Sequence, residues 1–158
     1  ALRGRLEMLL LLSVFSLNSI FIQMEDIDFS SNCKAAEEIL SSYGYSKVRS
    51  SADLTLYEGQ NSAHKTYLEC VDGATSRIEF EIEFVDETLA LDNFYSFSED
   101  LASMYGVPVL EYFAHHFIAF RQYCHGDEMI SVHITKGRKN VVSVTKNVDG
   151  DWLPCKSH

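Results

Sequence analysis

The sequence predicts an α+β fold in which two helices accompany an antiparallel sheet, open or closed into a barrel, after an N-terminal membrane or signal helix. Three observations support this prediction. Apolar residues alternate with polar residues in short segments, they recur at helical spacing in two segments, and they fill one uncharged run near the N-terminus. The expected order of elements is helix–strand–strand–strand, twice over (αβββαβββ).

The first element, residues 1–24, has the features of a membrane-targeting segment. Arg3 and Arg5 precede a run of 17 uncharged residues, MLLLLSVFSLNSIFIQM, and acidic residues follow it. This length lies between a signal-peptide core and a membrane span, and the flanking charges orient the C-terminal side outward. Because Leu17 would occupy position −3 of a cleavage site after Ser19, we expect an uncleaved, single-pass anchor in a bacterial inner membrane. The alternative is a cleaved signal peptide and a secreted or periplasmic protein.

Residues 25–158 then form a single extracytoplasmic domain of ordinary size. The chain is acidic, with 13 Lys and Arg residues against 23 Asp and Glu residues. This charge excludes nucleic acid as a partner, because nucleic-acid binding needs clustered positive charge. An acidic surface suits a basic partner protein, although it also serves solubility alone.

The first predicted helix covers residues 34–42, with Asn32 as its N-cap and Tyr43-Gly44 at its end. The alternation of residues 48–57 predicts one strand, and residues 64–71 predict a second.

Residues 77–85 form the clearest strand of the chain. Its apolar side chains share one face, whereas Glu79, Glu81 and Glu83 share the other. We expect this glutamate row to be a solvated face or a sheet edge that is charged against aggregation. An acidic binding face is the alternative.

The second half repeats this order. A helix over residues 87–105 ends at Gly106, and Pro108 prevents its continuation. Three strands follow, over residues 111–124, 129–136 and 141–148.

Two short segments suggest an internal repeat. Glu37–Gly44 recurs approximately as Glu99–Gly106, and Cys70-Val71-Asp72-Gly73 recurs as Cys124-His125-Gly126-Asp127. Because ordinary helix-ending chemistry also favours Tyr-Gly, the sequence leaves open whether the chain arose by duplication.

The strand over residues 111–124 is apolar on both faces, so it is expected to be central or to line a barrel. Its aromatic and histidine side chains are candidates for binding a lipophilic ligand or a partner: Tyr112, Phe113, Phe117, Phe120, Tyr123, His115 and His116. The two adjacent histidines point to opposite faces of a strand and cannot bind one metal ion together. They are either structural or sensors of pH near 6. His133 is expected opposite Ala119 or Phe120.

Four cysteines, Cys33, Cys70, Cys124 and Cys155, lie in the expected extracytoplasmic part. An even number of cysteines in an exported chain predicts two disulfides, with three possible connectivities. Cys33 and Cys155 lie near the two ends of the domain, so each is expected to fix a terminus to the sheet. The cysteine and histidine spacings match no zinc site, and we expect neither a metal nor another cofactor.

The sequence contains no G-x-S-x-G, S-x-x-K or H-E-x-x-H motif, so we expect a non-enzymatic protein. Its layout of basic stub, single span and small, acidic, disulfide-linked domain resembles the virulence-associated accessory partners of membrane-bound transcriptional regulators in enteric bacteria and vibrios, the ToxS, VtrC and PsaF/MyfF type. The resemblance implies a heterodimer in which the chain stabilises a membrane-bound regulator and senses a lipophilic ligand or pH. The alternative is a periplasmic immunity or inhibitor protein that neutralises a basic toxin or hydrolase.

Overall fold

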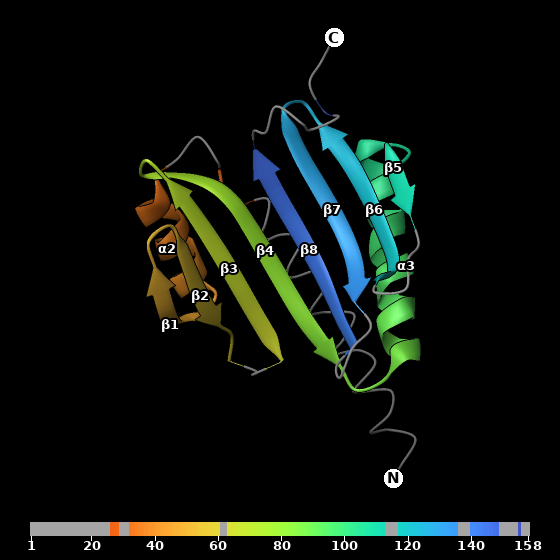
Figure 1. Ribbon diagram of the computed structural model, residues 1–158, viewed down its shortest axis with the longest axis horizontal. Helices are drawn as coiled ribbons and strands as arrows, with labels where there is room; N and C mark the ends of the chain where they lie inside the picture. The colour runs from red at the N-terminus through yellow and green to blue at the C-terminus, as the bar shows by residue number, and fades with distance from the viewer. Residues whose placement is uncertain are drawn as a thin grey trace.

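The computed structural model describes residues 26–28, 32–60, 63–112, 117–135, 140–148 and 155. Its elements in chain order are α2 (Cys33–Ser42), β1 (Ser46–Ser51), β2 (Leu54–Glu58), β3 (His64–Val71), β4 (Ala74–Phe84), α3 (Glu87–Tyr105), β5 (Leu110–Tyr112), β6 (Phe117–His125), β7 (Glu128–Thr135) and β8 (Asn140–Val148). The predicted α+β class with an antiparallel sheet and two helices is therefore confirmed (Figure 1).

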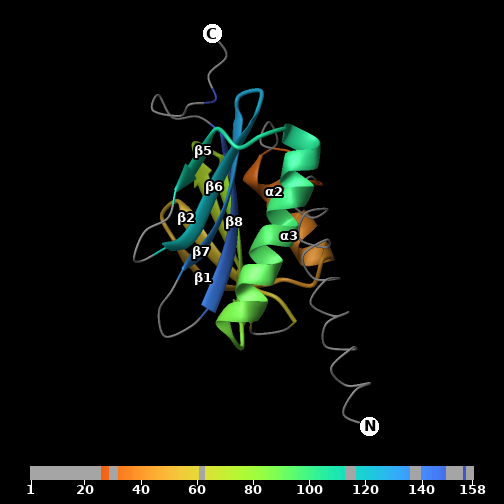
Figure 2. The ribbon, with the colours of Figure 1, turned by 90° about the vertical axis from the view of Figure 1, so that its right-hand side faces the viewer.

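The eight strands form one open antiparallel sheet in the order β1-β2-β3-β4-β8-β7-β6-β5. The barrel alternative is wrong, because β1 and β5 are the two ends of this order and do not pair with each other. In the edge-on view both helices lie on one side of the sheet, while β5 and the β1–β2 edge curve toward the other side (Figure 2). We refer to the side without α2 and α3 as the open face.

The prediction of three strands in each half is also wrong, because two predicted strands are hairpins. The segment over residues 48–57 turns at Ala52-Asp53, which brings Ser51 of β1 opposite Leu54 of β2. The segment over residues 111–124 is divided between β5 and β6, which pair antiparallel with Tyr112 opposite Phe120. Because the residues before and after this second turn are apolar, the sequence pattern resembles one continuous strand and does not reveal the turn.

Each half of the chain is therefore one helix followed by four consecutive antiparallel strands, and the halves join where β4 pairs with β8. This topology supports the internal repeat for the two helices, since the Tyr-Gly segments end α2 and α3 at equivalent places. It does not support the cysteine correspondence. Cys70 ends the third strand of the first half, whereas Cys124 ends the second strand of the second half.

The predicted N-cap of α2, Asn32, and the predicted end of α3, Gly106, are confirmed, and the N-cap of α3 is Asp86. Asn32 caps α2, with its Oδ1 accepting from the Ala35 backbone N–H at 2.9 Å. Asp86 caps α3 in the same way, accepting from Leu89 at 2.8 Å. Gly106 ends α3 with a φ of +84°, a left-handed conformation that glycine adopts without steric cost.

The core lies between the helices and the sheet. The predicted alternation of β4 is confirmed, because its even-numbered residues Ile78, Phe80, Ile82 and Phe84 are buried on the helix side. They pack with apolar residues of α3, namely Ala90, Phe94, Phe97 and Leu101. Tyr123 of β6 belongs to this core, and its hydroxyl donates to the Ser98 carbonyl at 3.0 Å.

All four cysteines are paired, as predicted, and the connectivity is Cys33–Cys70 and Cys124–Cys155. Each bridge fixes one end of the domain to the sheet, since Cys33 begins α2 and Cys155 follows the last strand. Two disulfides suggest an oxidising, extracytoplasmic compartment.

Within the described residues, neither helix combines the length and hydropathy needed to cross a bilayer. The anchor expected over residues 1–24 and the side chains of Phe113, His115 and His116 lie outside the described residues. The anchor therefore stays a prediction, as does the domain boundary at residue 25.

Removing either disulfide should lower the stability of the domain substantially. The bridged cysteines are 37 and 31 residues apart, and loops of this size contribute about 4 kcal/mol each in the chain-entropy model. We expect the double variant Cys33→Ala/Cys70→Ala to lose on the order of this amount in urea denaturation. Free thiols at all four positions in protein exported to an oxidising compartment would contradict the prediction.

Candidate functional site

Neither α2 nor α3 covers the open face. The strand register determines which side chains lie on it. One row across the sheet contains Phe120, His133, Ser143, Glu81 and Lys65, each opposite the next on the neighbouring strand. The adjacent row contains Gln122, Ser131, Thr145, Glu79 and Tyr67. Paired side chains in such rows have Cβ atoms roughly 5 Å apart, so neighbours within a row are in contact.

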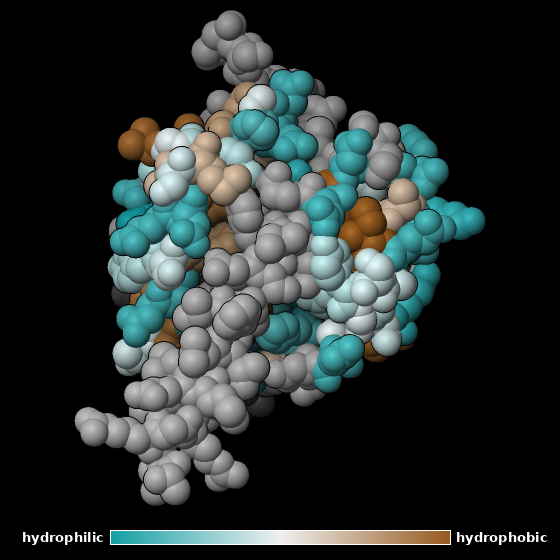
Figure 3. Space-filling view, turned by 180° about the vertical axis from the view of Figure 1, so that it is seen from behind, coloured by the Kyte–Doolittle hydropathy of each residue, from teal (hydrophilic) through white to brown (hydrophobic). Residues whose placement is uncertain are grey.

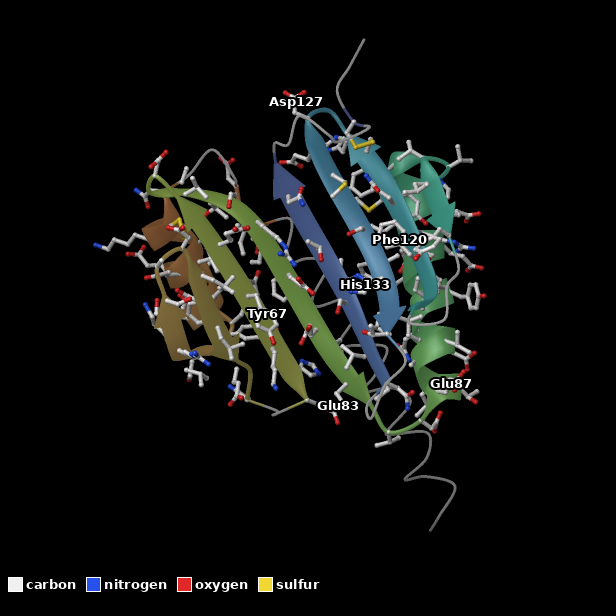
Figure 4. The ribbon with its side chains drawn as sticks, viewed as in Figure 1. Tyr67, Glu83, Glu87, Phe120, Asp127 and His133 are labelled. Carbon is white, nitrogen blue, oxygen red and sulfur yellow. A yellow bond between two sulfur atoms is a disulfide. The ribbon has the colours of Figure 1, made fainter. Side chains whose placement is uncertain are left out.

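Small hydroxyl residues occupy the middle of this face. Ser131, Ser143 and Thr145 are 5%, 1% and 6% exposed, respectively. Larger side chains flank them, with Phe120 and His133 on one side and Tyr67 on the other (Figure 4). The centre of the open face is therefore polar but poorly accessible.

The three glutamates share the open face, as predicted, but they are neither freely solvated nor on an edge. Their strand, β4, pairs with β3 on one side and with β8 on the other, so it is central. Glu79 is only 8% exposed and forms an ion pair with Arg77. The expectation of a solvated row or a charged edge is wrong, because neighbouring strands on both sides enclose the carboxylates.

Burial changes the chemistry of Glu81. Desolvation raises the pKa of its carboxyl group, and the nearby charge of Glu79 raises it further. The Tyr67 hydroxyl, which hydrogen bonds to Glu81, and the cations Lys65 and Arg77 act in the opposite direction. The pKa of Tyr67 is itself raised, first by burial and then by these two carboxylates.

His133 lies opposite Phe120, as predicted, with ring centroids 6.5 Å apart. Burial lowers the pKa of its imidazole, the charge of Glu79 opposes this shift, and Arg77 adds to it. The sequence pattern could have placed His133 on the open face, because this residue alternates with three inward-facing apolar residues of β7. The adjacent pair His115 and His116 is the more conspicuous pattern in the sequence, and the pH-sensing prediction therefore names those two residues instead.

The predicted aromatic candidates separate onto different surfaces. Tyr112 is 47% exposed on the edge strand β5 and contacts Phe120, with ring centroids 6.3 Å apart. Tyr123 is 1% exposed and points to the helix side. Phe117 belongs to β6, but its side chain is not described. The structure thus brings together Tyr112, Phe120 and His133, and it keeps Tyr123 apart.

The edge formed by β5 and the segment before it is apolar and exposed. Val107, Val109, Leu110 and Tyr112 are 84%, 52%, 47% and 47% exposed. Behind this edge, the Arg121 guanidinium packs over the rings of Phe94 and Tyr95 at 5.6 and 5.4 Å, and its Nε pairs with Glu111 at 2.8 Å. These contacts fix β5 to β6 and α3.

The arrangement supports binding better than nucleophilic catalysis. Ser143 lies between His133 and Glu81, whereas a catalytic triad places the histidine between the nucleophile and the acid. Ser143 is also almost fully buried. Among the described residues, no three His, Cys, Asp or Glu side chains are placed to hold a metal ion.

Comparison with known protein families, with curated proteins and with solved structures finds no match for this chain.

His133 should make the domain less stable in mild acid. Because its folded-state pKa is lower than the ordinary value of 6.5, the unfolded chain binds a proton first, and stability falls as pH decreases below about 6.5. We expect His133→Gln to reduce the loss of melting temperature between pH 7.5 and pH 5. His64→Gln on β3 should act in the same direction, because burial also lowers the pKa of His64. An unchanged pH profile in His133→Gln would contradict the assignment.

Replacing Glu81 with glutamine should stabilise the domain at neutral pH. A raised pKa in the folded state means that stability falls as pH rises above the ordinary value of 4.5. The amide removes the charge and retains an oxygen for Tyr67. Since the side chain is partly exposed, we expect a gain below about 1 kcal/mol at pH 7 that disappears near pH 4. Chemical denaturation of Glu81→Gln, with Glu38→Gln on α2 as control, measures this difference.

Proposed function

We propose that this chain is a non-enzymatic, extracytoplasmic accessory domain that binds and stabilises a membrane-bound regulator. The single observation that carries the proposal is the exposed apolar edge at β5, formed by Val107, Val109, Leu110 and Tyr112. The oxidised cysteines fit an extracytoplasmic site of action. A membrane tether at residues 1–24 is not required by this edge and stays a prediction.

An edge strand offers unpaired backbone N–H and C=O groups, and proteins usually protect such edges with charge. The opposite edge, β1, follows this rule, because its sequence SKVRSS contains two cations and three serines. The β5 edge does not, since Leu110 and Tyr112 are exposed there. An apolar, unprotected edge of this kind suits the addition of a strand or an apolar surface from a partner protein.

The open sheet favours a protein partner over the small lipophilic ligand also considered. A lipophilic ligand needs an apolar cavity, whereas the centre of the open face consists of hydroxyl side chains with carboxylates beside them. A pH response is supported by the lowered pKa of His133, which lies one strand from Phe120 and two from the β5 edge.

The immunity or inhibitor alternative would use the acidic open face. Its supporting observation is that Glu81 and Glu83 lie on the uncovered side of β4, both partly exposed. Two observations weaken the immunity alternative: Glu79 is paired with Arg77, and the pKa of Glu81 is raised. A basic toxin would meet less negative charge here than the sequence suggests.

The two functions predict different sensitive residues. The test first asks whether a neighbouring reading frame encodes a membrane-spanning DNA-binding regulator. Such a regulator is then co-expressed with this chain, and its half-life is measured. Tyr112→Asp should shorten the half-life several-fold, because a charge at the β5 edge opposes burial against a partner. Ser96→Asp, which adds the same charge on the exposed side of α3, should have no effect.

Two results would overturn the accessory function. One is a regulator half-life that does not depend on this chain. The other is protection of cells against a basic toxin that Glu81→Lys abolishes and Tyr112→Asp leaves intact, which is the behaviour of an immunity protein.

A further inference from the structure

The β5 edge has two sides with different chemistry. Leu110 and Tyr112 alternate with Glu111 along the strand, so their side chains lie on opposite sides of the sheet. Tyr112 contacts Phe120 on the open face, whereas Glu111 pairs with Arg121 on the helix side, where this arginine packs on α3. A strand added beside β5 places its own alternate side chains on these same two sides.

The helix side of the edge can accept a further cation. The Glu111 side chain is 45% exposed, although its Oε1 pairs with the Arg121 Nε at 2.8 Å. Beside this pair, the Tyr95 ring is 43% exposed and packs against the Arg121 guanidinium at 5.4 Å. A second guanidinium or ammonium group at this place meets a carboxylate and an aromatic ring, both of which attract cations.

α3 adds negative charge beside this edge. Its 19 residues include Glu87, Asp92, Glu99 and Asp100 and contain no lysine or arginine. Asp92 and Glu99 lie three residues before and four residues after Tyr95, so all three share one side of the helix. Within the described residues, neither of these two carboxylates takes part in an ion pair.

The exposed strand and the acidic helix lie on the same end of the molecule. In the edge-on view β5 and α3 both face the viewer, joined by the short segment that follows α3 (Figure 2). Seen from behind, with the α3 side of the molecule on the left, the described surface there is mostly hydrophilic (Figure 3). The apolar edge is therefore bordered on its helix side by an acidic surface.

We propose that the β5 edge binds an extended strand of a partner protein in which a basic residue lies between two apolar residues. The apolar residues lie beside Leu110 and Tyr112 on the open face, and the basic residue lies opposite Glu111, next to Tyr95. Backbone pairing with β5 provides affinity, and the alternating side chains provide selectivity. This inference rests on the proposed function, because it names the kind of partner segment that the β5 edge recognises.

A second copy of this chain does not offer such a strand at its other edge. β1 has the sequence SKVRSS, in which one apolar residue, Val48, lies between two cations, the reverse of the pattern that suits β5. Lys47 also pairs with Glu37 of α2 at 3.7 Å. A contact between β1 of one copy and β5 of the next is head-to-tail and extends into a filament unless it closes into a ring. The occupant that fits is therefore a strand of a different protein.

The test uses the full chain, purified with its disulfides intact, and short synthetic peptides as probes. One peptide alternates valine and arginine, a second alternates valine and glutamate, and a third has the composition of the first with its valines and arginines in two blocks. Fluorescence anisotropy should show that the alternating arginine peptide binds several-fold more tightly than the other two. Raising the salt concentration should weaken this binding, because the Debye length falls from about 10 Å at 0.1 M to about 3 Å at 1 M.

Two matched pairs of variants locate the binding surface. Leu110→Ser should weaken binding of the alternating arginine peptide several-fold, whereas Met104→Ser, which removes a similarly exposed apolar side chain from the opposite side of α3 to Tyr95, should not. Glu99→Lys should weaken it more than Glu38→Lys, which makes the same charge change on the exposed surface of α2. Melting temperatures identify any variant that fails to fold, and Tyr112→Ser then replaces Leu110→Ser.

Three results would overturn the inference. They are equal affinity for the three peptides, equal weakening by Glu99→Lys and Glu38→Lys, and self-association that Leu110→Ser abolishes, which assigns the edge to a second copy. If a regulator half-life still depends on Tyr112 in any of these cases, the proposed function stands and the partner uses a different kind of segment. Selective peptide binding together with a regulator half-life that Tyr112→Asp leaves unchanged contradicts the accessory function and supports the strand preference.

Discussion

The antiparallel pairing of β4 with β8 is the constraint on which the rest of this structure depends. It joins two halves that each consist of a helix and four consecutive strands. On the helix side it places Phe80 opposite Val144 and Ile82 opposite Val142, all buried. Without this pairing, β4 and β8 would both be edge strands, with unpaired backbone groups along the whole seam.

The same pairing determines the electrostatics of the open face. Because β8 lies beside β4, Glu79 faces Thr145 and Glu81 faces Ser143 instead of facing water. The carboxylates are thereby partly desolvated. Burial and mutual repulsion raise the pKa of Glu81, while Arg77 pairs with Glu79. A row of acids that looks like a solvated surface in sequence becomes a partly enclosed network beside His133, in which Glu79 is paired with Arg77.

The two edges of the sheet show how similar halves acquire different properties. The β1 edge contains Lys47 and Arg49, and all six of its residues are exposed. The β5 edge is three residues long and apolar, and the Arg121–Glu111 pair fixes it to β6. Positive charge keeps the first edge in water, whereas the second is stable only if its exposed apolar residues are few or are covered by a partner. This asymmetry directs the functional proposal to β5.

The sequence by itself determined what local physics controls. It predicted both helices, the N-cap of the first and the end of the second, the two faces of β4, the position of His133 opposite Ala119 or Phe120, and the oxidation of all four cysteines. Each depends on periodicity, on side-chain bonding to nearby backbone, or on compartment chemistry, and these act over a few residues.

Only the tertiary structure decided which strands are neighbours. The turn at Ala52-Asp53, the division between β5 and β6, the disulfide connectivity and the open form of the sheet all depend on contacts between distant segments. The burial of Glu79 differs from the predicted solvated position for the same reason. Alternation along one strand shows which side chains share a face, but the strands on both sides determine whether that face is in water.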